Sequence, residues 1–272
     1  MRLTPGNVAA VNDLYTRIDD TGELTDEIER FLDESLERPF AGIRNRLIYG
    51  PAFGLNGELA ALTSDERVAI SRFLSFQQLR TPSEREATRW LGYVSTHLFS
   101  RDSTAAGSEL REHVERAVRR GLNPAEAEIL RKAVLDLPQL HAGIDDWLPR
   151  TTRNAERLAH VINAFEWQLI RLPDTYSLPT CDTPLVCVRD VDGTGDYELG
   201  GGWNEPGFEA TFTLSPRDLL YITKAVRDEG YLRSPTFADS VFKRTIAHAT
   251  EWVYSAVPDP RIDAIAFHRS QA

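Results

Sequence analysis

The 272-residue sequence has only two cysteines and no long apolar run. Two cysteines exclude a disulfide-stapled scaffold and a metal site made of cysteines alone. Because no stretch of about 18 to 20 apolar residues occurs, no membrane-spanning helix is predicted. The opening residues, Met1 to Gly6, lack the apolar core of a signal peptide. We therefore expect a cytoplasmic protein without a membrane partner.

Positive charge is scarce as well. Lysine and arginine number 31 against 41 aspartate and glutamate residues, so the net charge is −10 at pH 7. This balance disfavours a protein that binds nucleic acid through overall positive charge and ignores its sequence. The remaining composition, 42% hydrophobic and 26% charged, is that of a folded globular chain.

The familiar catalytic motifs are also missing. The chain has no GxSxG, HExxH, Walker or CxxC motif. The Gly200-Gly201-Gly202 run follows no strand-to-helix step, so no phosphate loop is predicted there. The sequence motifs therefore indicate no reaction, and the cofactor and the partners stay unknown at this stage.

Three capping signals indicate helices in the first half of the chain. Thr63, Thr81 and Asn123 each precede an acidic residue by three positions, as in a capping box. Apolar residues recur at helical spacing behind each of them. Further helices are indicated by the same spacing over residues 28–43, 110–118 and 151–163. Pro39 predicts a kink, and Pro138 and Pro149 predict helix boundaries.

The second half of the chain changes to strand-like patterns. Short runs rich in β-branched and aromatic residues predict strands over residues 165–172, 185–188, 209–214 and 219–223. The Gly- and Asp-rich segment 190–202 predicts a loop, and residues 215–218 predict a turn between strands. A closing helix is predicted over residues 237–255.

This order of elements predicts an α+β fold. A helical region, residues 1–163, would pack on a small antiparallel sheet with a closing helix, residues 164–272. No repeat, low-complexity tract or linker separates the two regions, so we expect one integrated domain.

Two patterns suggest metal ligands, and neither is complete. Residues 190–201 resemble the start of a calcium loop with Gly195 at its sixth position, but Gly201 stands where the closing glutamate belongs. A solvated acidic loop is therefore favoured. Carboxylate and imidazole groups also share a helix face in two pairs, Glu156 with His160 and His248 with Glu251. Ordinary surface pairs are the favoured interpretation, so no metal is predicted.

The cysteines Cys181 and Cys187 lie six residues apart across a predicted strand. An extended chain would separate them by about 20 Å, which is too far for a disulfide. A catalytic thiolate needs a nearby base that the sequence does not supply. Buried core thiols are therefore predicted.

Three segments in order resemble the domain-of-unknown-function 4238 family. They are residues 72–82 (RFLSFQQLRTP), 178–186 (LPTCDTPLV) and 212–216 (FTLSP). In that family a helix ends in a Gln-x-x-Arg-Thr-Pro-like step, and Thr-Ser-Asp-x-Pro-like and Leu-Ser-Pro-like turns follow. Here Cys181 replaces the serine, whereas Asp182 and Pro184 match. The resemblance spans nearly the whole chain.

The resemblance implies no known reaction. Some members are associated with bacterial phage-defence islands, which implies a role in that setting. The family typically begins with a His-x-x-Pro segment, and nothing like it precedes Tyr15 here. If that histidine is catalytic in the family, we expect this chain to be either truncated or inactive.

The recognisable segments supply the candidate site residues. Asp182, at a sharp turn, and Arg80, at a helix end, are the candidate catalytic residues. Two interpretations fit them: a turn cap and a salt bridge between elements, or the polar floor of a cleft. In the second interpretation the walls bind substrate through four residues, Gln78, Thr183, Ser215 and Arg217.

Two functions follow as hypotheses. The first is a hydrolase or nuclease that acts on an anionic substrate, with Asp182 as base or metal ligand and Arg80 or Arg217 steadying the anion. The alternative is a non-enzymatic binding or sensor module in a phage-defence system. The absent histidine, the acidic balance and the lack of a complete catalytic set favour this alternative.

Overall fold

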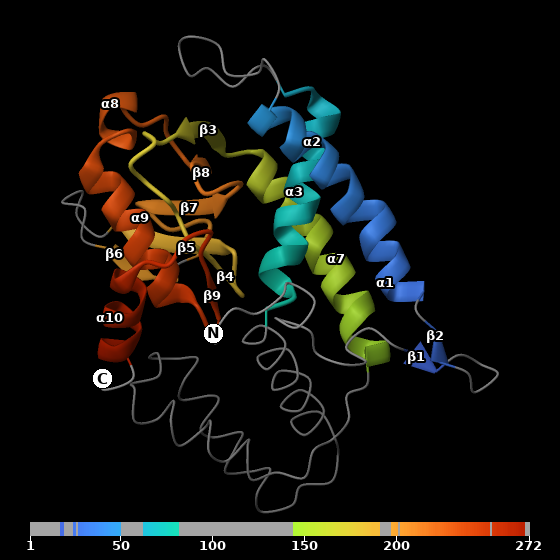
Figure 1. The fold of residues 1–272 in the computed structure, drawn as a ribbon. Coiled ribbons are helices and arrows are strands. Elements are labelled where there is room, and N and C mark those ends of the chain that lie inside the picture. The colour runs from blue at the N-terminus through green and yellow to red at the C-terminus, as the bar shows by residue number, and fades with distance from the viewer. Residues whose placement is uncertain are drawn as a thin grey trace, which may run out of the picture. The chain divides into compact units, whose positions relative to one another are not determined.

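The computed structural model describes most of one compact unit of the chain (Figure 1). The described residues are 17–18, 24–25, 27–49, 62–81, 144–190, 197–200, 202–250 and 252–269. Internal contacts divide the chain into one unit of residues 1–81 with 151–272 and a second of residues 82–150. The helices predicted after Thr81 and Asn123 and over residues 110–118, and the boundary at Pro138, lie outside the described residues. The division into residues 1–163 and 164–272 stays a prediction.

The helical predictions that the described residues test are largely confirmed. The described helices of the first half are α1 (Glu27–Leu32), the π-helical turn η2 (Asp33–Glu37), α2 (Arg38–Tyr49), α3 (Ser64–Leu79) and α7 (Ile144–Asn163). Two antiparallel strands of two residues each, β1 (Arg17–Ile18) and β2 (Leu24–Thr25), precede them. The Thr63 capping box forms, because the Thr63 hydroxyl accepts from Glu66 N at 3.2 Å and Glu66 Oε2 accepts from Thr63 N at 2.9 Å.

Proline has different effects at the two positions where a kink or a helix boundary was predicted, Pro39 and Pro149. The boundary predicted at Pro149 is wrong, because α7 runs through that residue. The buried stripe of Ala155, Ala159 and Ile162 supplies packing that opposes the helix-breaking tendency of proline. Before Pro39 the helix widens into η2, where the backbone N–H of Arg38 bonds Asp33 O, five residues back.

The second half forms a five-stranded antiparallel sheet in the order β3-β8-β7-β5-β6, which confirms the α+β prediction. Its strands are β3 (Glu166–Arg171), β5 (Leu185–Asp190), β6 (Tyr197–Leu199), β7 (Phe208–Thr213) and β8 (Asp218–Thr223). Beside it, β4 (Thr180–Cys181) pairs with β9 (Val253–Tyr254), and the helices are α8 (Glu229–Leu232), α9 (Pro235–His248) and α10 (Pro260–Arg269). The predicted turn over residues 215–218 joins β7 to β8.

Two boundaries of the second half differ from prediction. The predicted closing helix over 237–255 is wrong at its end, because α9 ends at His248 and β9 follows. Thr183 Oγ1 donates to His248 O at 2.7 Å, so a side chain from elsewhere in the fold binds a terminal carbonyl of α9. The segment 190–202 is not wholly a loop, because β6 lies within it and pairs with β5.

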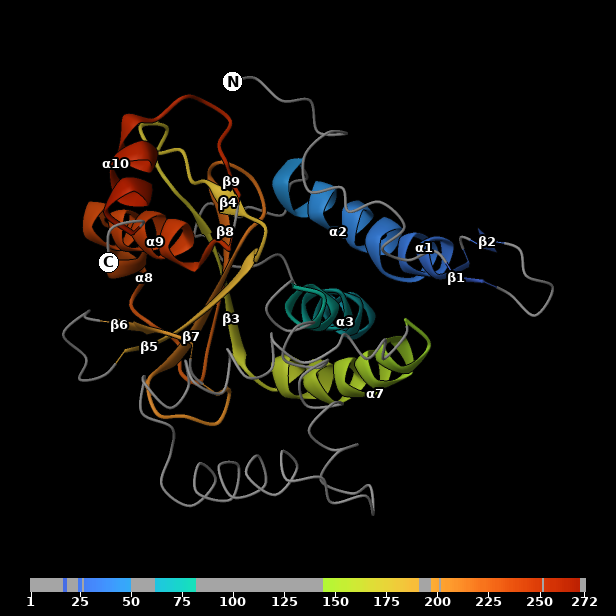
Figure 2. The same ribbon diagram turned by 90° about the horizontal axis from the view of Figure 1, so that it is seen from below.

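Helices cover both faces of the sheet (Figure 2). On one face Phe212 meets the rings of Phe40 and Phe73 edge-on, with centroids 5.7 and 5.9 Å away. On the other face Tyr221 meets Phe237 of α9 at 5.6 Å. This double cover explains why every residue of β8 is buried, whereas a sheet with one wet face would alternate. Among the described residues no helix is long and apolar enough to span a membrane.

Candidate functional site

Arg80 and Gln78 lie at the end of α3 and contact neighbouring elements. Arg80 Nη1 pairs with Glu37 Oε1 at 2.7 Å, and Arg80 Nε donates to Gln77 Oε1 at 3.1 Å. Gln78 Oε1 accepts from the indole N–H of Trp203 at 3.2 Å. Arg80 thus joins α3 to η2, and Gln78 joins α3 to the segment before β7.

Asp182 and Thr183 instead bind the chain at the end of α9. Besides the bond from Thr183 to His248, Asp182 Oδ1 accepts from Thr250 N at 2.9 Å, and Asp182 N donates to Trp252 O at 3.1 Å. The structure therefore brings Asp182 and Thr183 together, but it gives Arg80 its ion pair with Glu37 rather than with Asp182.

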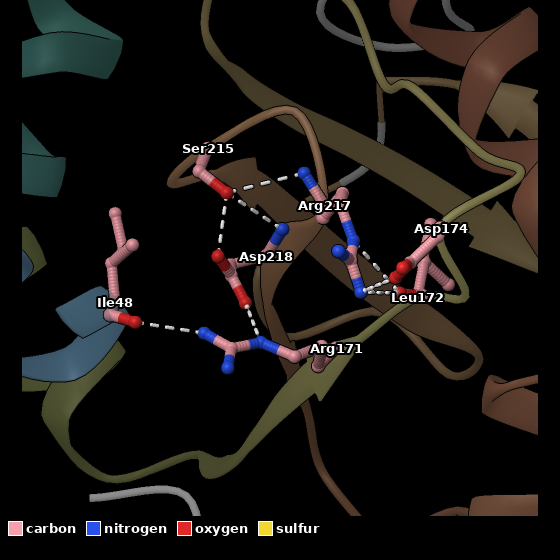
Figure 3. A network of polar contacts seen from close by, with 7 residues as sticks. All are labelled: Ile48, Arg171, Leu172, Asp174, Ser215, Arg217 and Asp218. Carbon is pink, nitrogen blue, oxygen red and sulfur yellow. Dashed lines mark hydrogen bonds and ion pairs between the residues drawn. The ribbon is translucent and has the colours of Figure 1, made fainter. Parts of the chain in front are cut away.

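Ser215 and Arg217 are brought together in the turn between β7 and β8 (Figure 3). The Ser215 hydroxyl donates to Asp218 Oδ2 at 2.5 Å and accepts from the backbone N–H groups of Arg217 and Asp218 at 3.1 and 3.0 Å. The Arg217 guanidinium pairs with Asp174 and donates to Leu172 O. Each polar side chain of this turn is therefore held by several bonds.

Arg171 extends this network to helix α2 and was not among the predicted site residues. Its Nε donates to buried Asp218 Oδ1 at 2.7 Å, and its Nη2 donates to Ile48 O at 2.8 Å (Figure 3). Arg171 and Asp218 are directly paired across β3 and β8. Arg171 lies near the end of one predicted strand and Asp218 directly before another, and their opposite charges are a signal that sequence reasoning could have used.

A pocket of about 460 Å³ lies beside this turn. Its lining residues come from α2, β4, β7, the following turn and β9: Phe40, Arg44, Leu178, Thr180, Phe212, Thr213, Leu214, Ser215, Pro216, Tyr254, Ser255 and Ala256. Of the predicted site residues, Ser215 lines it. A pocket of this volume fits a small molecule.

Arg44 is the only charged residue among the described residues that line the pocket. Its side chain is half-buried, and Nε donates to Leu214 O at 2.5 Å. No carboxylate of the described part of the chain pairs with it. The pocket therefore contains a guanidinium group that has no carboxylate partner in the described part of the chain, and guanidinium N–H groups are suited to binding anions.

A second group of charges lies on the α9 face of the sheet, away from this pocket. Glu209 accepts from Arg244 Nη1 at 3.3 Å and from Arg227 Nη2 at 3.0 Å. Arg227 also pairs with Asp190 at 3.4 Å. Burial, reinforced by the nearby Glu209 carboxylate, raises the pKa of the Tyr221 phenol. These groups form an ionic cluster in which Arg244 and Glu209 are buried and Arg227 is partly exposed.

The described residues contain no group of three or more potential metal ligands. Of the pairs considered from sequence, Glu156 forms an ion pair with Arg72, and Glu251 lies outside the described residues, as does most of the acidic segment 190–201. Cys181 and Cys187 are both buried, which confirms that they are core thiols.

Comparison with known proteins identifies one family. Residues 2–259 match the family described as "Protein of unknown function (DUF4238)". No curated protein and no solved structure matches the chain. The match covers most of the chain and agrees with the resemblance carried by segments 72–82, 178–186 and 212–216. The chain therefore belongs to the DUF4238 family.

Proposed function

We propose that this chain is a binding or sensor protein whose ligand is a small anion held by Arg44 in the pocket beside the β7–β8 turn. The observation that carries the proposal is the half-buried Arg44 guanidinium, which lines the pocket and has no carboxylate partner among the described residues. A partly desolvated cation attracts an anion more strongly than an exposed one does.

The contacts of the predicted site residues favour binding over chemistry. A nucleophilic serine needs a free hydroxyl near a base, but Ser215 Oγ already makes three hydrogen bonds and the Asp218 carboxylate that it bonds is neutralised by Arg171. Arg80 is occupied by Glu37, and Asp182 accepts from Thr250 N. A hydrolase or nuclease would have to release these contacts before Asp182 and Arg80 reached one substrate.

The phage-defence setting implied by the family resemblance suits such a module. In that setting, the level of an anionic metabolite would report infection, and the pocket would detect it. Loss of protection against phage in a cell that carries Arg44→Gln, with the protein still present at its normal level, is the expected phenotype.

The direct test is binding. Purified protein is incubated with a panel of small carboxylates, phosphates, sulfates and nucleotides, and complexes are detected by native mass spectrometry and isothermal titration calorimetry. We expect at least one anion to bind with one site per chain, and Arg44→Gln to weaken it by about 10- to 100-fold. The matched control is Arg153→Gln, which removes the same charge from an exposed position on α7. Absence of any binder, or equal binding by both variants, would refute the proposal.

A further inference from the structure

Three of the five hydroxyl groups of the pocket wall, those of Thr213, Ser215 and Ser255, donate to bonds within the protein. Thr213 Oγ1 donates to Pro179 O at 3.2 Å, Ser215 Oγ donates to Asp218 at 2.5 Å, and Ser255 Oγ donates to Val257 O at 2.6 Å. Each hydroxyl has a single hydrogen, so none of these three has a donor left for a ligand. The pocket is consequently less polar than its residue types suggest.

Apart from Arg44, Thr180 and Tyr254, the rest of the wall is apolar. It is formed by the rings and aliphatic groups of Phe40, Leu178, Phe212, Leu214, Pro216 and Ala256. A sugar or a nucleotide would lose its bonds to water here and would find few partners in exchange, which is unfavourable for each polar group buried. An apolar body would instead gain free energy from every methylene removed from water.

From this wall and its single cation we infer that the ligand is an amphipathic monoanion: one carboxylate bound by Arg44, carried on an apolar chain or ring of about six to ten carbons. The inference rests on the proposed function and names its ligand class. A second negative charge would be buried without a cation among the described lining residues, which disfavours dianions such as phosphate monoesters. The volume of about 460 Å³ lies towards the small end of ligand pockets, consistent with such a molecule.

The test measures binding of chemically matched probes by calorimetry below their micelle concentrations. The probes are octanoate, hexanoate, octanol, inorganic phosphate and adenosine monophosphate. We expect octanoate to bind with one site per chain and hexanoate to bind about 15-fold more weakly, at about fourfold per methylene. Octanol, which keeps the chain but lacks the charge, should bind at least tenfold more weakly than octanoate. Phosphate and the nucleotide should not bind.

Two variants separate the charge from the apolar wall. Arg44→Gln should weaken octanoate at least tenfold and leave octanol unchanged. Ala256→Trp places a large ring at an exposed position of the lining and should weaken both probes. Arg153→Gln is the charge control and should change neither. Thermal unfolding followed by circular dichroism establishes that each variant is folded.

The outcomes distinguish this inference from the proposed function. Arg44-dependent binding of phosphate or the nucleotide, with no binding of octanoate, would overturn the ligand class and leave an anion site in place. Octanoate binding that is unchanged in Arg44→Gln, or that takes several molecules per chain, would overturn the inference as well. If no probe and no member of the anion panel bound, both proposals would fall.

Discussion

Removing the negative charge of Glu209 should destabilise the protein far more than removing its buried arginine partner. The Arg244 side chain is 3% exposed and Glu209 is its one carboxylate partner in the described part of the chain. Glu209→Gln keeps the shape of the side chain but leaves a buried guanidinium uncompensated. Breaking a buried pair in this way costs about 3 to 5 kcal/mol of unfolding free energy.

The reverse change has a smaller effect. Arg244→Met leaves Glu209 bonded to Arg227, whose side chain is 38% exposed and partly solvated. It also removes two buried nitrogens, Nε and Nη2 of Arg244, that have no hydrogen-bond partner among the described residues. We therefore expect a loss of at most about 2 kcal/mol. The double variant Glu209→Leu with Arg244→Met should be more stable than Glu209→Gln alone, because no unpaired Arg244 charge remains.

Urea unfolding followed by circular dichroism measures these differences by linear extrapolation. The single variant Glu209→Leu completes a double-mutant cycle with Arg244→Met and the double variant, which isolates the coupling between Glu209 and Arg244 from their separate effects. Equal losses in Glu209→Gln and Arg244→Met, or a double variant less stable than both single variants, would refute the assignment of Glu209 as the compensating charge.

Two further predictions concern the sheet. Gly207 has φ +72°, and a Cβ atom there would collide with the Asp190 carbonyl, so Gly207→Ala should lower the free energy of unfolding by about 3 kcal/mol or more. Gly200 has φ +89° but open space around it, so Gly200→Ala should lower the free energy of unfolding by only about 1 kcal/mol in the same urea assay. Because burial raises the pKa of Tyr221 in the folded state, an unfolded phenol ionises first, and stability should fall above about pH 10 by up to about 1.4 kcal/mol per pH unit from this group. Tyr221→Phe should make that fall shallower between pH 9 and 11, and an identical slope would contradict it.

Elements whose signals are local were predictable from the sequence. The Thr63 capping box needs only residues three positions apart, and strand β7 is predicted by the β-branched and aromatic side chains within it. Features set by distant residues were not. The end of α9 depends on a bond from Thr183, 65 positions earlier, and β6 forms because β5 is available as its partner.

The candidate site shows the same limit. Ser215 and Arg217 lie in a short turn that its serine and proline residues predict. They are two positions apart in the sequence, so their proximity follows from the turn itself. Arg44 reaches Leu214 across 170 positions, and Arg171 reaches Ile48 across 123. No periodicity within either helix or strand encodes such a contact. No pattern in the sequence indicates Glu37 as the partner of Arg80, because the two residues lie 43 positions apart.

The length of the wide turn η2 sets how α2, which carries Arg44, is rotated relative to α1. In an ordinary α-helix each step of four residues overshoots a full turn by about 40°, so a row of side chains drifts around the axis. The extra residue in η2 changes the rotation of α2 about its axis relative to α1, and on α2 Phe40 packs against Phe212 while Arg44 bonds Leu214 O. Shortening this turn by a single residue would rotate everything after it by about 100° relative to α1. The position of the Arg44 guanidinium in the pocket thus depends on the length of η2, which does not itself line the pocket.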